Sequence, residues 1–592
     1  MYPATIFNWH DNSAITVPQV AAEIDDAPLF MQVFSADKGT EDLIEISGSN
    51  FDAMYGTMSF DKHGQSAIQA KNIIDNGGRL LAKRVVAEDS TLANAVIVAN
   101  VAVTSGTVKV TWEVKTFTGC TSFKQVMDQA SALLDDENGK YPLIVYCDNG
   151  RGKSIKAVRL VPDYSASKTV GKTFYNLVVY EGSNITEQTT ISFDPTVVYS
   201  DTAYRLDQYT NIQISGSVIE DVYELYVAKI ASALNLDTDV ARSYDIIYGY
   251  TNRGIAIPNF SIAGADLDAD TGIVLQSGSN GAFGDAPANS TAWTNAIVKV
   301  FNGSFTDEVW DVDQHKIAAV VDANYPFAVK QAIFAFVSFR EDCFYFRDFG
   351  CGVNALNESL DTLLGIKAAY ERFSAPYTLG NKTWDKQRNF FVSDYCSTYQ
   401  IKDPTTKKNI EVTMTYDMAG ALVNHIATVP FAPVAGTSND MILPGAIKGT
   451  LNFSPVITPV VNQKEALDEI RVNYAIFEDD QCVVQSCYTS QEEYTQLSFN
   501  CNTIGIQRVL RAVRTACPKQ RYSLSTGADL QDYATAVNNV LSNYVTNFDT
   551  LNFIYTQDPL KASQKIFYAS IEFAFLSWAQ TEIFDVYAIN NQ

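Results

Sequence analysis

The clearest metal-binding pattern in the 592-residue sequence is an alternating run of aspartates at residues 266–272, Asp-Leu-Asp-Ala-Asp-Thr-Gly. Alternating carboxylates can direct several hard oxygens at one calcium ion. The run lacks the glycine that such a loop needs at its sixth place, and Ser277 stands where a bidentate glutamate belongs. The sequence therefore favours a solvated hairpin loop over a calcium site.

Two further patterns resemble sites only in composition. The glycine-rich stretch 278–284 has neither phosphate-loop spacing, and no lysine follows it, so it reads as a flexible connector. The carboxylate runs 135–137 and 478–480 lie beside turns, whereas acid/base chemistry needs carboxylates in different environments within a cleft. Both runs are interpreted as solvated surface.

The cysteines, histidines and serines form no recognisable catalytic or metal-binding signature. The nine cysteines include no CxxC pair, and the four histidines do not pair at helical ligand spacing. No G-x-S-x-G elbow occurs, and no serine or cysteine is linked to a histidine by a nucleophile signature. The cysteines are interpreted as reduced, mostly buried thiols. We predict no catalytic residue, no metal and no cofactor.

One local pattern runs against the net charge of -24, because Arg508, Arg511 and Arg514 recur every three residues in a predicted helix. Lys519 and Arg521 follow shortly after. Such a stripe could face an acidic partner. Alternatively, the arginines pair with carboxylates of their own chain. The sequence does not separate these two interpretations.

Composition excludes several classes of protein. A content of 46% hydrophobic against 19% charged residues is typical of a folded chain, and the length implies several domains. The acidic balance disfavours direct nucleic-acid binding. No stretch near 20 apolar residues occurs, and the first residues lack signal-peptide order. We therefore expect no stable membrane insertion, and we expect the protein to be made and kept in a cytoplasm.

The order of predicted elements indicates an α/β core that is interrupted by an insert. A buried strand at 29–34, a helix at 64–75 and a strand at 80–86 give a β-α-β start. The pattern returns as a strand at 317–321, a helix at 327–339, a strand at 343–346 and a helix at 361–373. Short links between these elements imply a parallel sheet with right-handed crossovers. A hairpin is expected around residues 403–404.

The insert and the C-terminal part differ in their patterns of apolar and turn residues. Short β-branched runs separated by turn residues indicate a β-rich insert, in which helices are expected at 123–134 and 218–234. The C-terminal part predicts helices near 463–473, 504–516 and 530–544, then a strand at 567–575 in which apolar residues alternate. The predicted domains are an extended arm at 1–26, core at 27–90, insert at 91–302, core at 303–440 and an α+β C-terminal domain at 441–592.

Both ends of the chain read as extended segments. An unpaired strand is a place where another subunit can add its own strand, so both segments are candidate intersubunit arms. The candidate arm residues are Ile15, Thr16, Val17, Ile583, Phe584, Val586, Tyr587 and Ile589.

Several of these segments, in order, resemble the contractile phage tail sheath family of myovirus type. They are residues 27–39, 51–56 and 73–79 before the insert, then 322–326, 339–343, 419–422 and 430–436 after it. The resemblance covers about residues 27–90 and 300–592. The sequence departs from the family at residues 17–20, which replace the usual Pro-Gly-Val-Tyr opening. It also departs around His425, where the charge expected before the loop at 430–436 is replaced.

The resemblance implies a mechanical protein of the virion tail. Its subunits would form stacked rings of six around an inner tail tube and would also contact the baseplate and the tail terminator. The stripe of Arg508, Arg511 and Arg514 would then be the candidate tube-facing surface. Strands donated by the terminal arms would connect the subunits, and contraction would drive the tube through the host envelope for genome delivery. Two alternatives remain: a sheath of a phage-derived injection system or bacteriocin, and a virion protein that binds or cleaves glycans.

Overall fold

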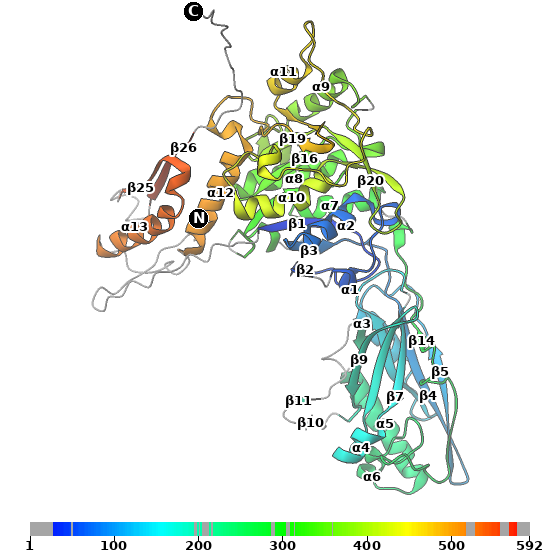
Figure 1. The fold of residues 1–592 in the computed structure, drawn as a ribbon. Helices are drawn as coiled ribbons and strands as arrows, with labels where there is room; N and C mark the ends of the chain where they lie inside the picture. Colours follow the sequence, from blue (N-terminus) through cyan, green and yellow to red (C-terminus); the bar gives the residue numbers. More distant parts are fainter. Residues whose placement is uncertain are drawn as a thin grey trace, which may run out of the picture.

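The computed structural model describes residues 28–48, 51–154, 156–194, 198–199, 202–203, 212–214, 217–285, 290–303, 308–312, 314–357, 359–516, 527–556 and 568–576. The molecule is elongated: a core lies at one end, an insert hangs from it, and a C-terminal unit lies at its side (Figure 1). The mixed α/β and α+β multidomain fold predicted from the sequence is confirmed.

The core is built on a seven-stranded sheet in the order β2-β3-β1-β15-β16-β19-β22, in which every neighbouring pair is parallel except β2 with β3. Strands from before and after the insert therefore lie side by side at the sheet centre, where β1 pairs with β15. The strands are β1 (Leu29–Phe34), β2 (Leu43–Ile46), β3 (Arg79–Arg84), β15 (Ile317–Val321), β16 (Phe344–Asp348), β19 (Val392–Tyr395) and β22 (Val472–Asn473).

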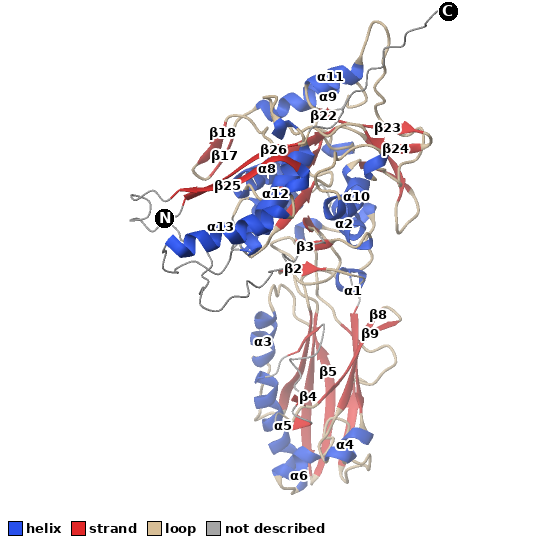
Figure 2. Cartoon of the chain, turned by 60° about the vertical axis from the view of Figure 1, so that its left-hand side comes forward, coloured by secondary structure: helices blue, strands red, loops and turns tan. Residues whose placement is uncertain are grey.

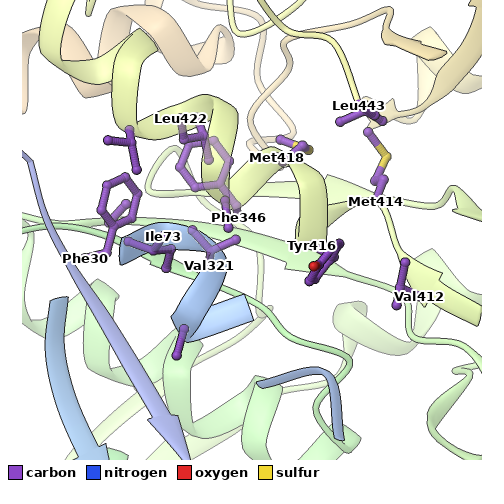
Figure 3. Close-up of a cluster of buried hydrophobic side chains, with 14 of the residues drawn as sticks. Phe30, Ile73, Val321, Phe346, Val412, Met414, Tyr416, Met418, Leu422 and Leu443 are labelled. Atoms are coloured by element: carbon purple, nitrogen blue, oxygen red, sulfur yellow. The ribbon is translucent and has the colours of Figure 1, made fainter. Parts of the chain in front are cut away.

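Helices cover both faces of this sheet, and the side chains of β1 alternate between them. Phe30 packs toward α2 and α10 (Figure 3), and Phe34 belongs to the same apolar cluster. Met31 and Val33 pack toward α7 and α8. A strand buried on both faces explains the continuous apolar run in the sequence. The core helices are α1 (Phe51–Tyr55), α2 (Phe60–Asp75), α7 (Thr291–Phe301), α8 (Phe327–Arg340), α9 (Leu363–Glu371), α10 (Thr415–Thr428) and α11 (Gln463–Glu469).

The Asn-Gly-Gly segment after α2 has two separate structural roles. Gly77 ends the helix with a φ of +81°, which favours glycine, and its N–H bonds the carbonyl of Ile74. Gly78 lies where an added Cβ would stand 2.7 Å from Ile73 and 2.8 Å from Val423 on α10. The first glycine is therefore needed for the turn and the second for close packing of α10.

Small hairpins complete the core. The hairpin predicted around residues 403–404 is confirmed, because β20 (Thr398–Lys402) pairs antiparallel with β21 (Asn409–Thr413). The two other pairs are β17 (Tyr377–Leu379) with β18 (Lys382–Trp384), and β23 (Ala475–Glu478) with β24 (Gln481–Val484).

The insert contains a five-stranded and a four-stranded sheet that share one apolar cluster with helix α5 (Figure 2). Helix α3 covers the opposite face of the five-stranded sheet. The strands are β4 (Asn94–Thr104), β5 (Thr107–Lys115), β6 (Lys140–Asp148), β7 (Lys156–Pro162), β8 (Tyr175–Glu181), β9 (Asn184–Ile191), β10 (Val198–Tyr199), β11 (Thr202–Ala203), β12 (Ile212–Ile214), β13 (Phe260–Gly264) and β14 (Ile273–Val274). The helices are α3 (Phe123–Ser131), α4 (Tyr164–Val170), α5 (Ser217–Leu234) and α6 (Thr238–Ser243). Both predicted helices of the insert are confirmed.

Ion pairs join the insert to the core at the junction of the two. Arg151 of the insert binds Glu41 of the core through Nε at 3.0 Å and Nη2 at 2.6 Å. Lys38 binds both oxygens of Glu181 at 2.6 and 2.7 Å. Buried Arg84 donates to the carbonyls of Ala36, Gly39 and Arg151, and so spans both domains. Charge-assisted hydrogen bonds of this kind fix the insert in one orientation.

Two domain boundaries differ from those expected. The insert was expected to run to residue 302, but Trp293, Ile297 and Phe301 of α7 lie in an apolar cluster of the core. The C-terminal domain was expected to begin at 441, but β22 belongs to the core sheet and Leu443 to its largest apolar cluster. Amphipathic patterns show that a helix has a buried face but do not identify the domain that covers it.

Over the residues described, the C-terminal unit contains two α-helices and one hairpin. Its elements are α12 (Asn500–Ala516), α13 (Gly527–Ser542), β25 (Phe548–Thr556) and β26 (Tyr568–Phe575). The alternation predicted for the last strand is confirmed over its described side chains, because Ile571, Phe573 and Phe575 pack against the two helices.

One buried carboxylate of the core predicts a measurable pH dependence. Burial raises the pKa of Asp417 on α10 to about 6, although the Tyr399 hydroxyl and the Gly445 N–H donate to it. Between pH 6 and 4 the folded state binds a proton that the unfolded state does not, so stability rises as pH falls.

Replacing Asp417 with Asn removes this titration. The stability of the Asp417→Asn variant relative to wild type should therefore fall by about 1 kcal/mol between pH 8 and pH 5. Urea unfolding of both proteins at the two pH values measures the change. An unchanged difference would contradict the raised pKa.

Candidate assembly surfaces

The motifs that could carry chemistry lie apart in the structure. Asp268 pairs with Arg159 at 2.7 Å, Asp266 accepts from the N–H of Asp268, and Asp270 is almost fully exposed. Among the described residues, no group of three or more histidine, cysteine or acidic side chains could hold a metal ion. The run 266–272 connects β13 of the five-stranded sheet to β14 of the four-stranded sheet. The loop expected from the sequence is confirmed, but the expected hairpin is wrong, because the two strands pair with different neighbours.

The cysteines within the described residues are free and buried. Burial raises the pKa of the Cys343, Cys396 and Cys482 thiols to about 12, which suppresses the reactive thiolate.

None of the helices that the structure describes is long and apolar enough to cross a bilayer.

The carboxyl edge of the core sheet is where open α/β folds usually bind ligands. In this protein it is filled by a buried ion cluster. Lys330 Nζ lies 2.9 Å from Asp322 Oδ1 and 2.6 Å from Asp348 Oδ1, and all three side chains are essentially inaccessible. Burial together with the nearby Asp348 charge raises the pKa of Asp322 to about 6.

Hydrogen bonds from both parts of the core complete this cluster. Thr413 and Thr415 donate to Asp348 Oδ2 at 2.8 and 2.9 Å. Gln65 of α2 donates to Thr413 at 2.7 Å, and Gln69 donates to the carbonyl of Asp322 at 2.8 Å. The cluster therefore connects α2, which precedes the insert, with strands that follow it. With its charges paired inside the core, it acts as a structural link.

Sequence reasoning missed this cluster, although a signal for it was present. Lys330 is the one lysine in the helix Phe327–Arg340, which is otherwise strongly apolar, and Asp322 directly follows the apolar strand 317–321. A charged residue within a fully buried element needs a partner, and that partner lies at the end of the same sheet.

The arginine stripe predicted on 504–516 lies on α12, and all three side chains contact oxygens of their own chain. Arg508 donates to the carbonyls of Ile426 and Ala427 at the end of α10, the second at 3.0 Å. Carbonyls at a helix C-terminus lack intrahelical partners and carry partial negative charge, so a guanidinium binds them well.

The other two arginines contact the turn between α8 and β16. Arg511 donates to the carbonyl of Asp342 at 2.8 Å, and Arg514 lies 3.5 Å from Asp342 Oδ2. The sequence left open whether the stripe faces a partner or pairs within its own chain. In the structure, every arginine of the stripe contacts an oxygen of its own chain. A role in facing the tube remains a prediction. Lys519 and Arg521 lie outside the described residues.

Removing these charges should loosen α12 from the core. In the triple variant Arg508→Gln, Arg511→Gln, Arg514→Gln we expect amide hydrogen exchange across residues 500–516 to accelerate by about tenfold or more, because three charge-assisted contacts are lost. The matched control is Arg253→Gln, an exposed arginine of the insert. Equal exchange in both variants would show that the arginines do not hold the helix.

The hairpin of the C-terminal unit is a candidate site for the addition of a strand. β25 and β26 pair only with each other over the residues described, and one face packs on α12 and α13. An isolated two-stranded sheet is marginal in water, and within the described residues neither strand has a second strand beside it. The candidate arm residues Ile15, Thr16, Val17, Ile583, Phe584, Val586, Tyr587 and Ile589 lie outside the described residues.

No protein-family model matches the sequence, and no curated protein matches it. Solved structures do match the fold. The sheath tail protein of Desulfitobacterium hafniense is 10% identical, with 96% of this chain and 100% of that chain covered and a TM-score of 0.45. The sheath tail protein of Listeria innocua is 9% identical, with 93% and 95% covered and a TM-score of 0.47. The contracted PVC sheath complex of an extracellular contractile injection system is 15% identical, with 46% and 71% covered and a TM-score of 0.35.

Proposed function

We propose that this chain is a structural subunit of a contractile tail sheath. One observation carries the proposal: the segments that resemble the sheath family, although separated by the insert, fold into one sheet domain in the family order. Residues 27–39 supply β1, 73–79 connect α2 to β3, and 322–326 connect β15 to α8. A chance set of weak motifs would not be expected to converge on one domain.

Assembly of the subunit would use strand addition at the C-terminal hairpin. Among the described strands, β25 and β26 pair only with each other, so each could accept a further strand at its outer edge. The candidate arms at 1–26 and 583–589 supply β-branched and aromatic residues suited to an added strand. Arms from neighbouring copies would bind there, and many backbone hydrogen bonds loaded together would transmit force between subunits.

The assembled object would be a stack of six-membered rings around an inner tail tube in a virion tail, bounded by the baseplate and the tail terminator. Contraction would drive the tube through the host envelope. A sheath subunit would not need a catalytic site. The carboxyl edge of its sheet, where such a site would be expected, is filled by paired ions. The insert extends away from the sheet and from the C-terminal unit, so its bulk would not obstruct contacts made by either.

Sedimentation velocity over a concentration series tests the proposal. An open-ended assembly predicts a broadening set of large species whose size grows with concentration. One closed oligomer of constant size, accompanied by binding to a saccharide array, would instead support a glycan-binding virion protein and overturn the sheath function.

A further inference from the structure

A short apolar turn projects from the carboxyl edge of the core. Residues 456–461 precede α11, at the upper end of the core in Figure 2, and every one of them is exposed. Val460 is 91% exposed and Ile457 63%, and Val456 and Val461 are about half exposed. Soluble chains rarely concentrate large apolar side chains on one projecting turn unless it contacts a partner.

The turn is held in one conformation rather than free to collapse. The Thr458 N–H donates to the carbonyl of Val461 at 2.7 Å, and the Gln463 N–H donates to the carbonyl of Val456 at 3.0 Å. The Thr458 hydroxyl also accepts from the Val461 N–H at 2.9 Å. A preorganised apolar turn loses little conformational entropy on binding, which favours a docking role.

A shallow surface pocket lies at the opposite edge of the same sheet. It opens where β1 and β15 begin, at Leu29 and Ala318, and α12 forms its wall with Ala512 and Thr515. Its lining combines apolar and basic side chains. The lining residues are Pro28, Leu29, Lys316, Ala318, Ile426, Arg508, Arg511, Ala512, Thr515 and Tyr544.

The turn and the pocket match in position and in charge. Phe453, at the root of the turn, packs with Phe349 and Cys396, which follow the carboxyl ends of β16 and β19. The turn therefore stands at the carboxyl edge and the pocket at the amino edge. Helix α11, directly behind the turn, has three carboxylates and one lysine, whereas the pocket contains two arginines and one lysine.

We propose that the apolar turn 456–461 of one copy docks in the amino-edge pocket of a second copy. Because the two surfaces lie at opposite ends of the domain, the contact is head-to-tail and builds an open series of copies. Acidic α11 then lies against the basic pocket, which sets the direction of docking. The proposal deepens the sheath function and rests on it for the choice of a second copy as the partner.

Substitutions at the two surfaces test the contact in the full-length chain. Val460→Asp should lower the yield of assembled protein by about tenfold or more, because it places a charge at the centre of an apolar contact. Thr515→Trp, which fills the mouth of the pocket, should do the same. The matched control Val103→Asp changes an exposed valine of the insert and should assemble normally. Wild-type assembly by both surface variants would overturn the proposal.

Cross-linking separates this contact from the sheath function. In a Cys517→Ser background, a chain with Val460→Cys and Thr515→Cys should give a ladder of dimers, trimers and longer products with a short bismaleimide. A mixture of the two single-cysteine chains should stop at dimers. A ladder without tubes would uphold the contact and contradict the sheath function. Tubes without a ladder would support the sheath function and overturn the proposed contact.

Two other occupants of the pocket give distinct results. Self-cross-linking of the Val460→Cys chain alone would indicate a two-fold contact and overturn the head-to-tail arrangement. Protection of Thr515→Cys from a maleimide in the monomer would indicate that the chain covers its own pocket, and would also overturn it.

Discussion

Replacing Lys330 with Met is expected to lower the free energy of unfolding of the core domain by about 3–5 kcal/mol. The substitution keeps the apolar stem of the side chain but removes the charge that lies between Asp322 and Asp348. Two carboxylates would then face each other in a site without solvent. Urea unfolding followed by tryptophan fluorescence measures the loss.

Two comparisons separate this effect from the general effect of losing a lysine. Lys408→Met removes an exposed lysine and should change stability by less than about 1 kcal/mol. Adding Asp322→Asn to Lys330→Met removes one unpaired carboxylate and should restore part of the loss. The loss should also be smaller at pH 5 than at pH 8, because one carboxylate can then be protonated. Similar unfolding midpoints for Lys330→Met and Lys408→Met would contradict the buried cluster.

Deleting either terminal arm is expected to abolish assembly and leave the subunit folded. We expect chains lacking residues 1–20 or the last ten residues to remain monomeric at concentrations at which the full chain polymerises, because the hairpin of β25 and β26 loses the strands proposed to complete it. Electron microscopy measures assembly, and circular dichroism with thermal unfolding measures folding. The control is Val103→Asp at an exposed valine of the insert, which should assemble as the full chain does. Full assembly of both terminal deletions would refute strand addition by the arms.

The core elements could be predicted from the sequence because their local signals agree with their environment. The strand at 29–34 is apolar throughout since both of its faces are covered, and the Asn-Gly-Gly segment at residues 76–78 ends a helix in the structure as it does in the pattern. The run 266–272 was correctly assigned to a loop, because the residues missing from the calcium pattern were visible in the sequence.

The remaining features depend on contacts between segments far apart in the chain. The side chains of Lys330 and Thr413 meet at Asp348 only after the sheet has formed. The carbonyls that bind the α12 arginines belong to α10 and to the α8–β16 turn, and backbone acceptors leave no trace in side-chain patterns. Likewise, the assignment of α7 to the core depends on which surface covers its apolar face. Sequence periodicity does not contain that information.

Negative-stain electron microscopy of the purified full-length chain tests the sheath function most directly. If the subunit polymerises by strand addition, we expect long hollow tubes with regular transverse striations, formed without nucleotide or metal. Monodisperse small particles at every concentration would contradict the proposed function.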